Sequence, residues 1–138
     1  MDYKLQKYEK YKDHRGDLVV FLRQSELKAE HKKFGQIYFV TFKKKGAIRG
    51  NHYHKKWREW FGIVSGKVDV FLMDVRTKEQ IHFVLDAKKD KYVRLEIGPY
   101  TVHTFRSKTK QASLLNYAIG EWSKNDDHKY ELVSRRTK

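Results

Sequence analysis

The chain has 138 residues, a formal net charge of +14 at pH 7, no cysteine and one proline. The lack of cysteine excludes disulfides, thiolate nucleophiles and Cys-ligated metal, and an aromatic content of 14% argues against disorder. No apolar run approaches the roughly 20 residues that a transmembrane helix needs, and no apolar segment typical of a signal peptide follows Met1. We therefore expect a single domain over residues 1–138, with no membrane partner and a cytoplasmic location.

The basic residues are spread along the chain. Lysines occur in short pairs and triplets, such as Lys43-Lys44-Lys45 and Lys88-Lys89, mostly where turns are expected. Nucleic-acid-binding proteins gather such charge on one face and carry a binding motif. The pattern here favours solvated turns over a nucleic-acid partner, although a nucleotide diphosphate would need only a few of these lysines.

The N-terminal third contains few strand signals. Residues 1–16 are polar and end in a turn at 13–16, and residues 18–22 (LVVFL) predict a short strand. Residues 24–33 are charged and predict a loop or one helical turn. Residues 34–42 (FGQIYFVTF) are rich in aromatic and β-branched side chains and predict a strand.

Short strands then follow at regular intervals. They are expected at residues 48–54, 59–64, 67–75, 80–85, 92–97, 101–105 and 112–119. Many short strands with few helical periods predict an all-β, antiparallel sandwich or barrel, and a small barrel is wide enough inside for one ligand. Only residues 125–136 are expected to be helical, with Asn125 or Asp126 as the cap.

Four residues form a candidate metal-ligand set. His52 and His54 are two residues apart on an expected strand, so they point to the same face. Glu59 follows on the expected return strand, and His103 lies on a later strand after Gly98-Pro99. Imidazoles and a carboxylate bind divalent metals such as Zn, Fe, Mn or Ni. The alternative is that the histidines lie on a solvent-facing edge strand and that Glu59 pairs with a neighbouring surface lysine.

The spacing of these residues resembles a known pattern. Gly46, five residues, His52-x-His54, four residues, Glu59, six residues and Gly66 resemble the first motif of the cupin superfamily. The segment from Gly98-Pro99 to His103 resembles the second. This resemblance implies a cupin-type antiparallel β-barrel or jelly roll. It also implies that His52, His54, Glu59 and His103 are the ligands if a metal is bound.

A wider resemblance covers nearly the whole chain. Residues 13–21 (DHRGDLVVF) and 49–55 (RGNHYHK) resemble segments of the nucleotide-sugar cupins, and residues 114–130 resemble the tail of one group of them. These are the dTDP-4-keto-6-deoxyglucose 3,4-ketoisomerases and the dTDP-4-dehydrorhamnose 3,5-epimerases. The resemblance implies an isomerase that acts on a nucleotide-linked 4-keto-6-deoxyhexose, with dTDP as the expected nucleotide, in deoxysugar or surface-polysaccharide biosynthesis.

The resemblance also implies a mechanism. A carbonyl acidifies the neighbouring C–H bond, so a base removes that proton and an acid returns one elsewhere. Return to the adjacent carbon through an enediol is 3,4-ketoisomerisation, and return to the opposite face of the same carbon is epimerisation. In the ketoisomerases the two histidines of this motif are the acid and the base, which implies these roles for His52 and His54. In the epimerases only the first histidine is catalytic, which implies a role for His52 alone. Tyr38 is expected to be a supporting acid.

Further residues are expected to bind the substrate, and they are Arg49, Arg15, Asn51, Lys55, Glu59, His103 and Tyr117. The resemblance to the ketoisomerases implies that no cofactor is required. However, these enzymes usually carry an amide at the position of Glu59. The carboxylate of Glu59 restores the metal-binding pattern of the cupin motif. The segment 49–54 also resembles cupin domains of capsular polysaccharide enzymes. A metal-dependent cupin enzyme and a non-catalytic sugar-binding cupin therefore stay as alternatives. The resemblance further implies a homodimer, formed by sheet extension.

Overall fold

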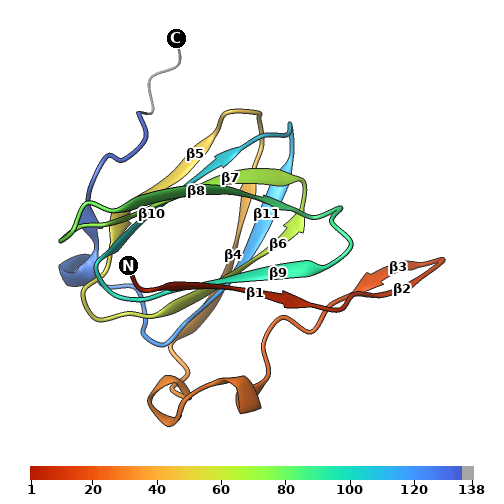
Figure 1. Ribbon diagram of the computed structural model, residues 1–138, viewed down its shortest axis with the longest axis horizontal. Coiled ribbons are helices and arrows are strands. Elements are labelled where there is room, and N and C mark those ends of the chain that lie inside the picture. Colours follow the sequence, from red (N-terminus) through yellow and green to blue (C-terminus); the bar gives the residue numbers. More distant parts are fainter. Residues whose placement is uncertain (135–138) are drawn as a thin grey trace.

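The computed structural model describes residues 1–134, which fold into two packed five-stranded sheets (Figure 1). One sheet contains, in spatial order, β1 (Tyr3–Tyr8), β9 (Tyr92–Ile97), β6 (Glu59–Ser65), β11 (Ala112–Ala118) and β4 (Gln36–Phe42). The other contains β12 (His128–Lys129), β5 (Ile48–Tyr53), β10 (Thr101–Ser107), β7 (Lys67–Asp74) and β8 (Gln80–Asp86). All of these strand pairs are antiparallel. The predicted all-β, cupin-type architecture is confirmed.

The remaining elements are short. The strands β2 (Tyr11–Asp13) and β3 (Gly16–Leu18) form a hairpin that projects from the sandwich (Figure 1). The described part of the chain also contains three 3-10 turns, which are η1 (Gln24–Glu26), η2 (Ala29–His31) and η3 (Lys124–Asp126). Within residues 1–134, no helix is long and apolar enough to cross a membrane.

The core lies between the two sheets. Val68, Val70 and Leu72 alternate along β7 and are fully buried against the opposite sheet, as the two-residue period of a strand requires. Phe61 on β6 and Phe105 on β10 belong to this core and also line a cavity at one side of it. The apolar core therefore forms one wall of the cavity.

The strand predictions from residue 34 onward are confirmed to within a few residues at each end, and so are the turn at 13–16 and the short helical turns within 24–33. The strand predicted at 18–22 is wrong, and the strand Tyr3–Tyr8 was not predicted. The polar residues Tyr3–Tyr8 form a strand because they pair with β9 at the sheet edge. Only Leu18 of the predicted strand 18–22 belongs to one. Val19 and Phe21 instead pack against the core without joining a ladder. Their apolar character reflects burial, which strand propensity does not distinguish from sheet pairing.

The predicted C-terminal helix is also wrong within the described residues. The tail forms the single 3-10 turn η3 and then β12, which pairs with β5. The residue that caps η3 is Ser123, whose hydroxyl accepts a hydrogen bond from the Asn125 N–H. Asp126 does not cap a helix, because its carboxylate accepts hydrogen bonds from the backbone N–H groups of Lys55 and Lys56. Residues 135–136 of the prediction lie outside the described residues.

A β-bulge in β5 sets the direction of the candidate site residues. His52 pairs with His103 and Gly50 pairs with Thr104, so Asn51 is an extra residue in the strand. Gly50 has φ +103°, and a Cβ at this position would lie 2.4 Å from the His103 carbonyl oxygen, so only glycine fits. Because of the extra residue, Arg49 and His52 face the same cavity although they are three residues apart.

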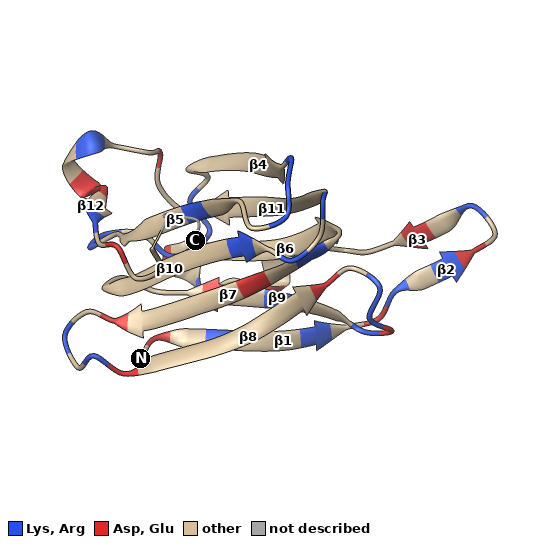
Figure 2. Cartoon of the chain, turned by 90° about the horizontal axis from the view of Figure 1, so that it is seen from above, with Lys and Arg blue, Asp and Glu red and all other residues tan. Residues whose placement is uncertain are grey.

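The basic residues are spread over turns and strands. Figure 2 shows Lys and Arg in the turns at both ends of the sandwich and also within strands, among them β1 and β5. The lysines in the turns agree with the sequence pattern, which predicts solvated turns, whereas Arg94 of β9 is buried.

Candidate active site

A cavity of about 310 Å³ lies between the two sheets and contains the candidate residues. Its wall includes Tyr38 from β4, Arg49 and His52 from β5, Glu59 from β6 and His103 from β10. Trp57 and Trp122, from the connections after β5 and β11, complete the wall. The volume is in the range of small-ligand sites.

Four polar side chains converge at the inner end of this cavity. The Nε2 atoms of His52 and His103 are 3.0 Å apart. The Glu59 Oε2 atom is 3.7 Å from Nε2 of His54 and 3.6 Å from Nε2 of His103. One ring nitrogen from each of the three histidines lies within 4.8 Å of the others. The sequence prediction that these residues meet at one point agrees with the geometry.

The opposite nitrogen of each histidine faces an acceptor. Nδ1 of His54 lies 2.6 Å from the Asp126 carbonyl oxygen, and Nδ1 of His103 lies 3.3 Å from the Thr101 carbonyl oxygen. Nδ1 of His52 lies 3.0 Å from Oδ1 of Asp127. Because carbonyl oxygens only accept, Nδ1 of His54 and Nδ1 of His103 carry the proton. Nδ1 of His52 faces the Asp127 carboxylate without an aligned hydrogen bond, so the contact there is electrostatic. Nε2 of each ring faces the convergence point.

Burial keeps these groups uncharged. Desolvation, with a smaller contribution from neighbouring His54, lowers the pKa of His52 to about 4. Desolvation also lowers the pKa values of His54 and His103. It raises the pKa of Glu59 to about 8, against a hydrogen bond from Asn116 that acts in the opposite direction. At neutral pH the centre thus holds three neutral imidazoles and a carboxyl group that resists ionisation.

This donor set fits a divalent cation. Within residues 1–134, Oε2 of Glu59 has no hydrogen-bond partner, although the side chain is buried. Two Nε2 lone pairs 3.0 Å apart repel each other unless a proton or a metal ion lies between them. His52, His54, His103 and Glu59 are the residues that would hold such an ion, and their Nδ1 contacts would orient the three rings.

The residues that contact Nδ1 of His52 and His54 come from the tail, and the sequence pattern did not identify them as site residues. Asp126 contacts His54 through its carbonyl oxygen, and its carboxylate fixes the turn after β5. Asp127 contacts His52 through Oδ1, while its Oδ2 accepts hydrogen bonds from Trp122 Nε1 and Lys129 Nζ. The available signal was the pair of adjacent carboxylates in the segment after β11, of which the helix prediction considered only Asp126, as a cap.

The structure places two further predicted residues at the cavity. Tyr38 lines it, and burial, together with the nearby Glu59, raises the pKa of the Tyr38 phenol, so this hydroxyl keeps its proton. Arg49 also lines it and donates from Nε to the Thr41 carbonyl oxygen at 3.1 Å.

Four predicted substrate-binding residues do not line the cavity. Asn51 points away from it and accepts hydrogen bonds on Oδ1 from Thr104 Oγ1 and from backbone N–H groups of the tail. The Tyr117 hydroxyl donates to backbone carbonyls in the segment before β4. The Lys55 side chain is exposed, and Arg15 lies on the projecting β2–β3 hairpin with 79% of its side chain exposed. Asn51 and Tyr117 therefore hold connecting segments in place.

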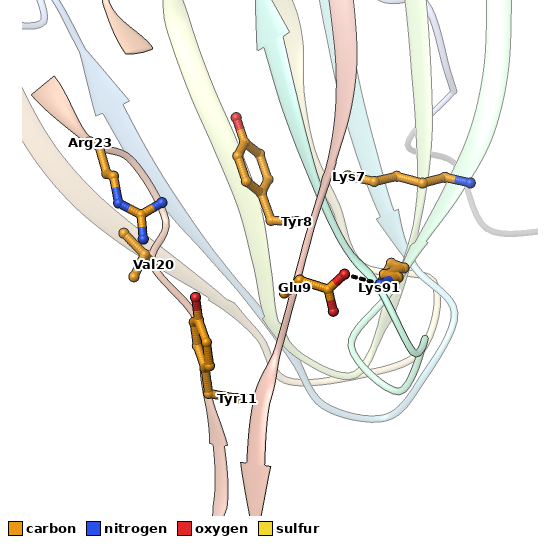
Figure 3. Close-up of a pocket in the computed structure, with 7 residues that line it drawn as sticks. All are labelled: Lys7, Tyr8, Glu9, Tyr11, Val20, Arg23 and Lys91. Carbon is orange, nitrogen blue, oxygen red and sulfur yellow. Dashed lines mark hydrogen bonds and ion pairs between the residues drawn. The ribbon is translucent and has the colours of Figure 1, made fainter. Parts of the chain in front are cut away.

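A second hollow, of about 390 Å³, lies where the hairpin leaves the sandwich (Figure 3). Its lining includes Lys7, Tyr8, Tyr11 and Arg23, and its carboxylate, Glu9, is ion-paired with Lys91. Because that carboxylate is ion-paired with Lys91 and no histidine lines the hollow, the cavity around His52 is the better candidate for acid–base chemistry.

Comparison with known proteins places the chain in a family. Residues 11–125 match the model of the polysaccharide biosynthesis C-terminal domain family. The chain belongs to this family. No curated protein sequence matches it significantly.

Solved structures of sugar-nucleotide enzymes share the fold. The 3'-monoepimerase ChmJ from Streptomyces bikiniensis, in complex with dTDP-quinovose, superposes with a TM-score of 0.81 at 19% identity, over 93% of this chain and 69% of ChmJ. The 3,4-ketoisomerase QdtA from Thermoanaerobacterium thermosaccharolyticum, in complex with TDP, gives 0.75 at 23% identity, over 91% and 86% of the two chains. A 3,4-ketoisomerase from Helicobacter canadensis gives 0.75 at 26% identity, over 92% and 90%.

Proposed function

We propose that the protein is an isomerase of a nucleotide-linked 4-keto-6-deoxyhexose, and that it moves the carbonyl between C4 and C3. The observation that carries this proposal is His52, a neutral imidazole on the cavity wall that is backed by the Asp127 carboxylate 3.0 Å from Nδ1. A neutral imidazole whose Nε2 is not bound to a metal accepts a proton as a general base, and a substrate that reaches Nε2 of His52 would replace its contact to His103. The solved 3,4-ketoisomerases and epimerases of similar fold support the same substrate class.

His52, Tyr38 and His54 are the residues that transfer protons in the proposed reaction. Nε2 of His52 takes the proton from C3, and the electron pair forms a C3–C4 double bond while O4 becomes an enolate oxygen. The enolate oxygen is protonated, for which the Tyr38 hydroxyl or His54 is available. A proton then returns to C4 as the C3 hydroxyl loses its own and becomes the carbonyl. Return of the proton to the opposite face of C3 would instead give an epimer, which is the alternative outcome of the same first step.

Proton exchange tests the proposal. When the protein is incubated with dTDP-4-keto-6-deoxyglucose in D₂O, the C3 proton signal is expected to disappear from the NMR spectrum, followed by signals of the 3-keto isomer. An epimerase would exchange C3 without forming the 3-keto isomer. A spectrum that is unchanged after extended incubation would contradict both reactions.

A metal-dependent enzyme is a second candidate, favoured by the unpaired Oε2 of Glu59 at the convergence of three Nε2 atoms. A divalent cation bound there would act as a Lewis acid on a sugar carbonyl or enolate oxygen. A histidine whose Nε2 lone pair binds a metal cannot also act as the base. Elemental analysis of untagged protein separates the candidates, because about one transition metal per chain is expected for the second and none for the first.

Asp127 is expected to be a positioning residue for His52. We expect Asp127→Asn to lower kcat for C3 exchange by roughly a hundredfold, because the neutral amide no longer stabilises the imidazolium that forms on proton abstraction. KM should change by less than about threefold, since Asp127 is buried behind the ring. Steady-state kinetics of both proteins check this, and an equal loss of kcat in Lys129→Ala, which keeps the carboxylate, would argue for a merely structural effect.

We also propose a homodimer in which Arg15 reaches the cavity of the other copy. The hairpin that carries Arg15 projects away from its own sandwich, and its Leu18 and Tyr11 side chains are about 60% exposed (Figure 1). A two-stranded hairpin is barely stable alone, and packing on a second copy would cover it.

A subunit-mixing experiment tests this arrangement. Arg15→Ala and His52→Ala are each expected to be inactive alone, whereas an equimolar mixture exchanged at low concentration should regain about one quarter of wild-type activity. Random mixing makes half of the dimers hybrids, and each hybrid has one complete site. A mixture that stays inactive, or a monomer in sedimentation, would contradict the proposal.

A further inference from the structure

Trp122 presents a large exposed ring at the mouth of the cavity. It is 56% exposed and lines the cavity, whereas Trp57 and Trp60 are at most 7% exposed. Its indole Nε1 donates to Oδ2 of Asp127 at 3.1 Å, and its backbone N–H donates to Oε1 of Gln36 at 2.9 Å. The ring is therefore held by hydrogen bonds while a broad apolar surface stays accessible, which costs free energy in water unless a ligand covers it.

The position of Trp122 is fixed relative to the proposed base. Asp127 contacts Trp122 through one carboxylate oxygen and His52 through the other, at 3.1 and 3.0 Å. The indole and the imidazole are thus separated by a single carboxylate group. The contact to Asp127 is made by Nδ1 of His52, whereas Nε2 faces His103, and both the imidazole and the indole line the cavity that a bound sugar would enter.

The chemical groups that line the cavity differ between the two ends of β4. Gln36 marks the Trp122 end, and Thr41 marks the end where Arg49 donates to a backbone carbonyl. Five residues of strand separate these two points, roughly 16 Å. One end of the cavity thus offers the aromatic surface of Trp122, and the other offers the Arg49 guanidinium, which is suited to phosphate oxygens.

We propose that Trp122 stacks against the hexose ring of the nucleotide sugar, with the diphosphate and nucleoside at the Arg49 end. This inference rests on the proposed function and names the group that recognises the sugar. In a nucleotide sugar, ribose and two phosphates separate the nucleobase from the hexose. The nucleobase therefore cannot lie beside Trp122 while C3 of the hexose lies at His52. The C–H groups on one face of a pyranose carry partial positive charge and pack on the electron-rich face of an indole.

Binding of two related ligands tests the proposal. dTDP-6-deoxyglucose and dTDP differ only in the hexose, and neither has the carbonyl needed for turnover. By calorimetry, Trp122→Ala is expected to raise the Kd of dTDP-6-deoxyglucose about tenfold and the Kd of dTDP by less than about twofold. Trp122→Phe should keep most of the affinity. The control is Phe34→Ala, which removes a ring that is 76% exposed and does not line the cavity.

Fluorescence gives an independent readout. Because the other two tryptophans are buried, acrylamide should quench mainly Trp122, and dTDP-6-deoxyglucose should protect it while dTDP should not. Equal weakening of both ligands in Trp122→Ala, or no weakening of either, would show that the indole does not recognise the hexose and would overturn the inference, while proton exchange at C3 tests the proposed function separately. Failure of the wild-type protein to bind either ligand would overturn the proposed function, and the inference with it.

Discussion

Replacement of His52 by asparagine is expected to lower C3 proton exchange by at least about a thousandfold, because asparagine keeps a polar side chain of similar reach but cannot accept the proton. The Kd of dTDP should change by less than about threefold, since His52 contacts the sugar and not the nucleotide in the proposed arrangement. NMR exchange in D₂O and calorimetry measure the two quantities. The matched control is His82→Asn, whose imidazole lies outside the cavity beside Asp69.

The pH dependence of the same reaction adds a second check. The pKa of His52 is lowered to about 4, chiefly by desolvation, so the ring is neutral and basic at every pH above this value. For free enzyme, kcat/KM is therefore expected to fall with acid only near pH 4 and not near the ordinary histidine value of 6.5. A decrease of kcat/KM as the pH falls below 6.5 would show that His52 is not the general base or that its ring is solvated in the working enzyme. Loss of bound metal in His52→Asn, with exchange otherwise retained, would instead assign His52 as a ligand.

The sequence was sufficient to predict the part of the molecule where local pattern and tertiary structure agree. From Gln36 onward, alternating apolar residues and regularly spaced turns coincide with strands that are buried on one face. His52 and His54 could be placed together for the same reason, since two-residue spacing on a strand fixes a common face. Joining them to Glu59 and His103 needed the resemblance as well, because those residues are far apart along the chain.

Features that depend on distant contacts could not be predicted. Tyr3–Tyr8 is polar and becomes a strand only because β9 offers an open edge. The bulge at Gly50 and Asn51 turns Asn51 out of the cavity. A prediction that assumes regular alternation of side chains along the strand does not include such a bulge. Asp127 reaches His52 through a turn whose course is set by contacts to β5. The residues missed at the site are thus those that position the histidines.

Glu59 gives the second large effect, on stability. Its pKa is raised to about 8 in the folded, metal-free protein, mainly because the side chain is fully buried, against an ordinary value of 4.5. Between these values the folded state binds a proton that the unfolded state has lost, so the free energy of unfolding falls as pH rises. Lowered pKa values of the three histidines act in the opposite direction, and only below about pH 6.5, where the unfolded chain gains their protons. The metal-free protein should therefore be most stable near pH 6.5.

The substitution Glu59→Gln should remove the alkaline side of this profile. In urea unfolding after chelator treatment, wild-type protein is expected to lose about 2 kcal/mol between pH 6.5 and 8, whereas Glu59→Gln should stay nearly constant over that range. The exposed Glu121, replaced by Gln, is the control and should follow the wild type. Identical slopes for Glu59→Gln and wild type would contradict the burial argument.

Added metal should reverse the sign of the effect if the second candidate function holds. A cation binds the deprotonated carboxylate, so it stabilises the folded state by an amount that grows with its concentration relative to Kd, and more strongly as pH rises. Wild-type protein with excess Zn²⁺ should then become more stable from pH 6.5 to 8, while Glu59→Gln should gain much less. If Zn²⁺ leaves the wild-type profile falling with pH, the carboxyl group acts as a buried neutral acid beside His54 and His103, and His52 keeps the free lone pair that proton transfer requires.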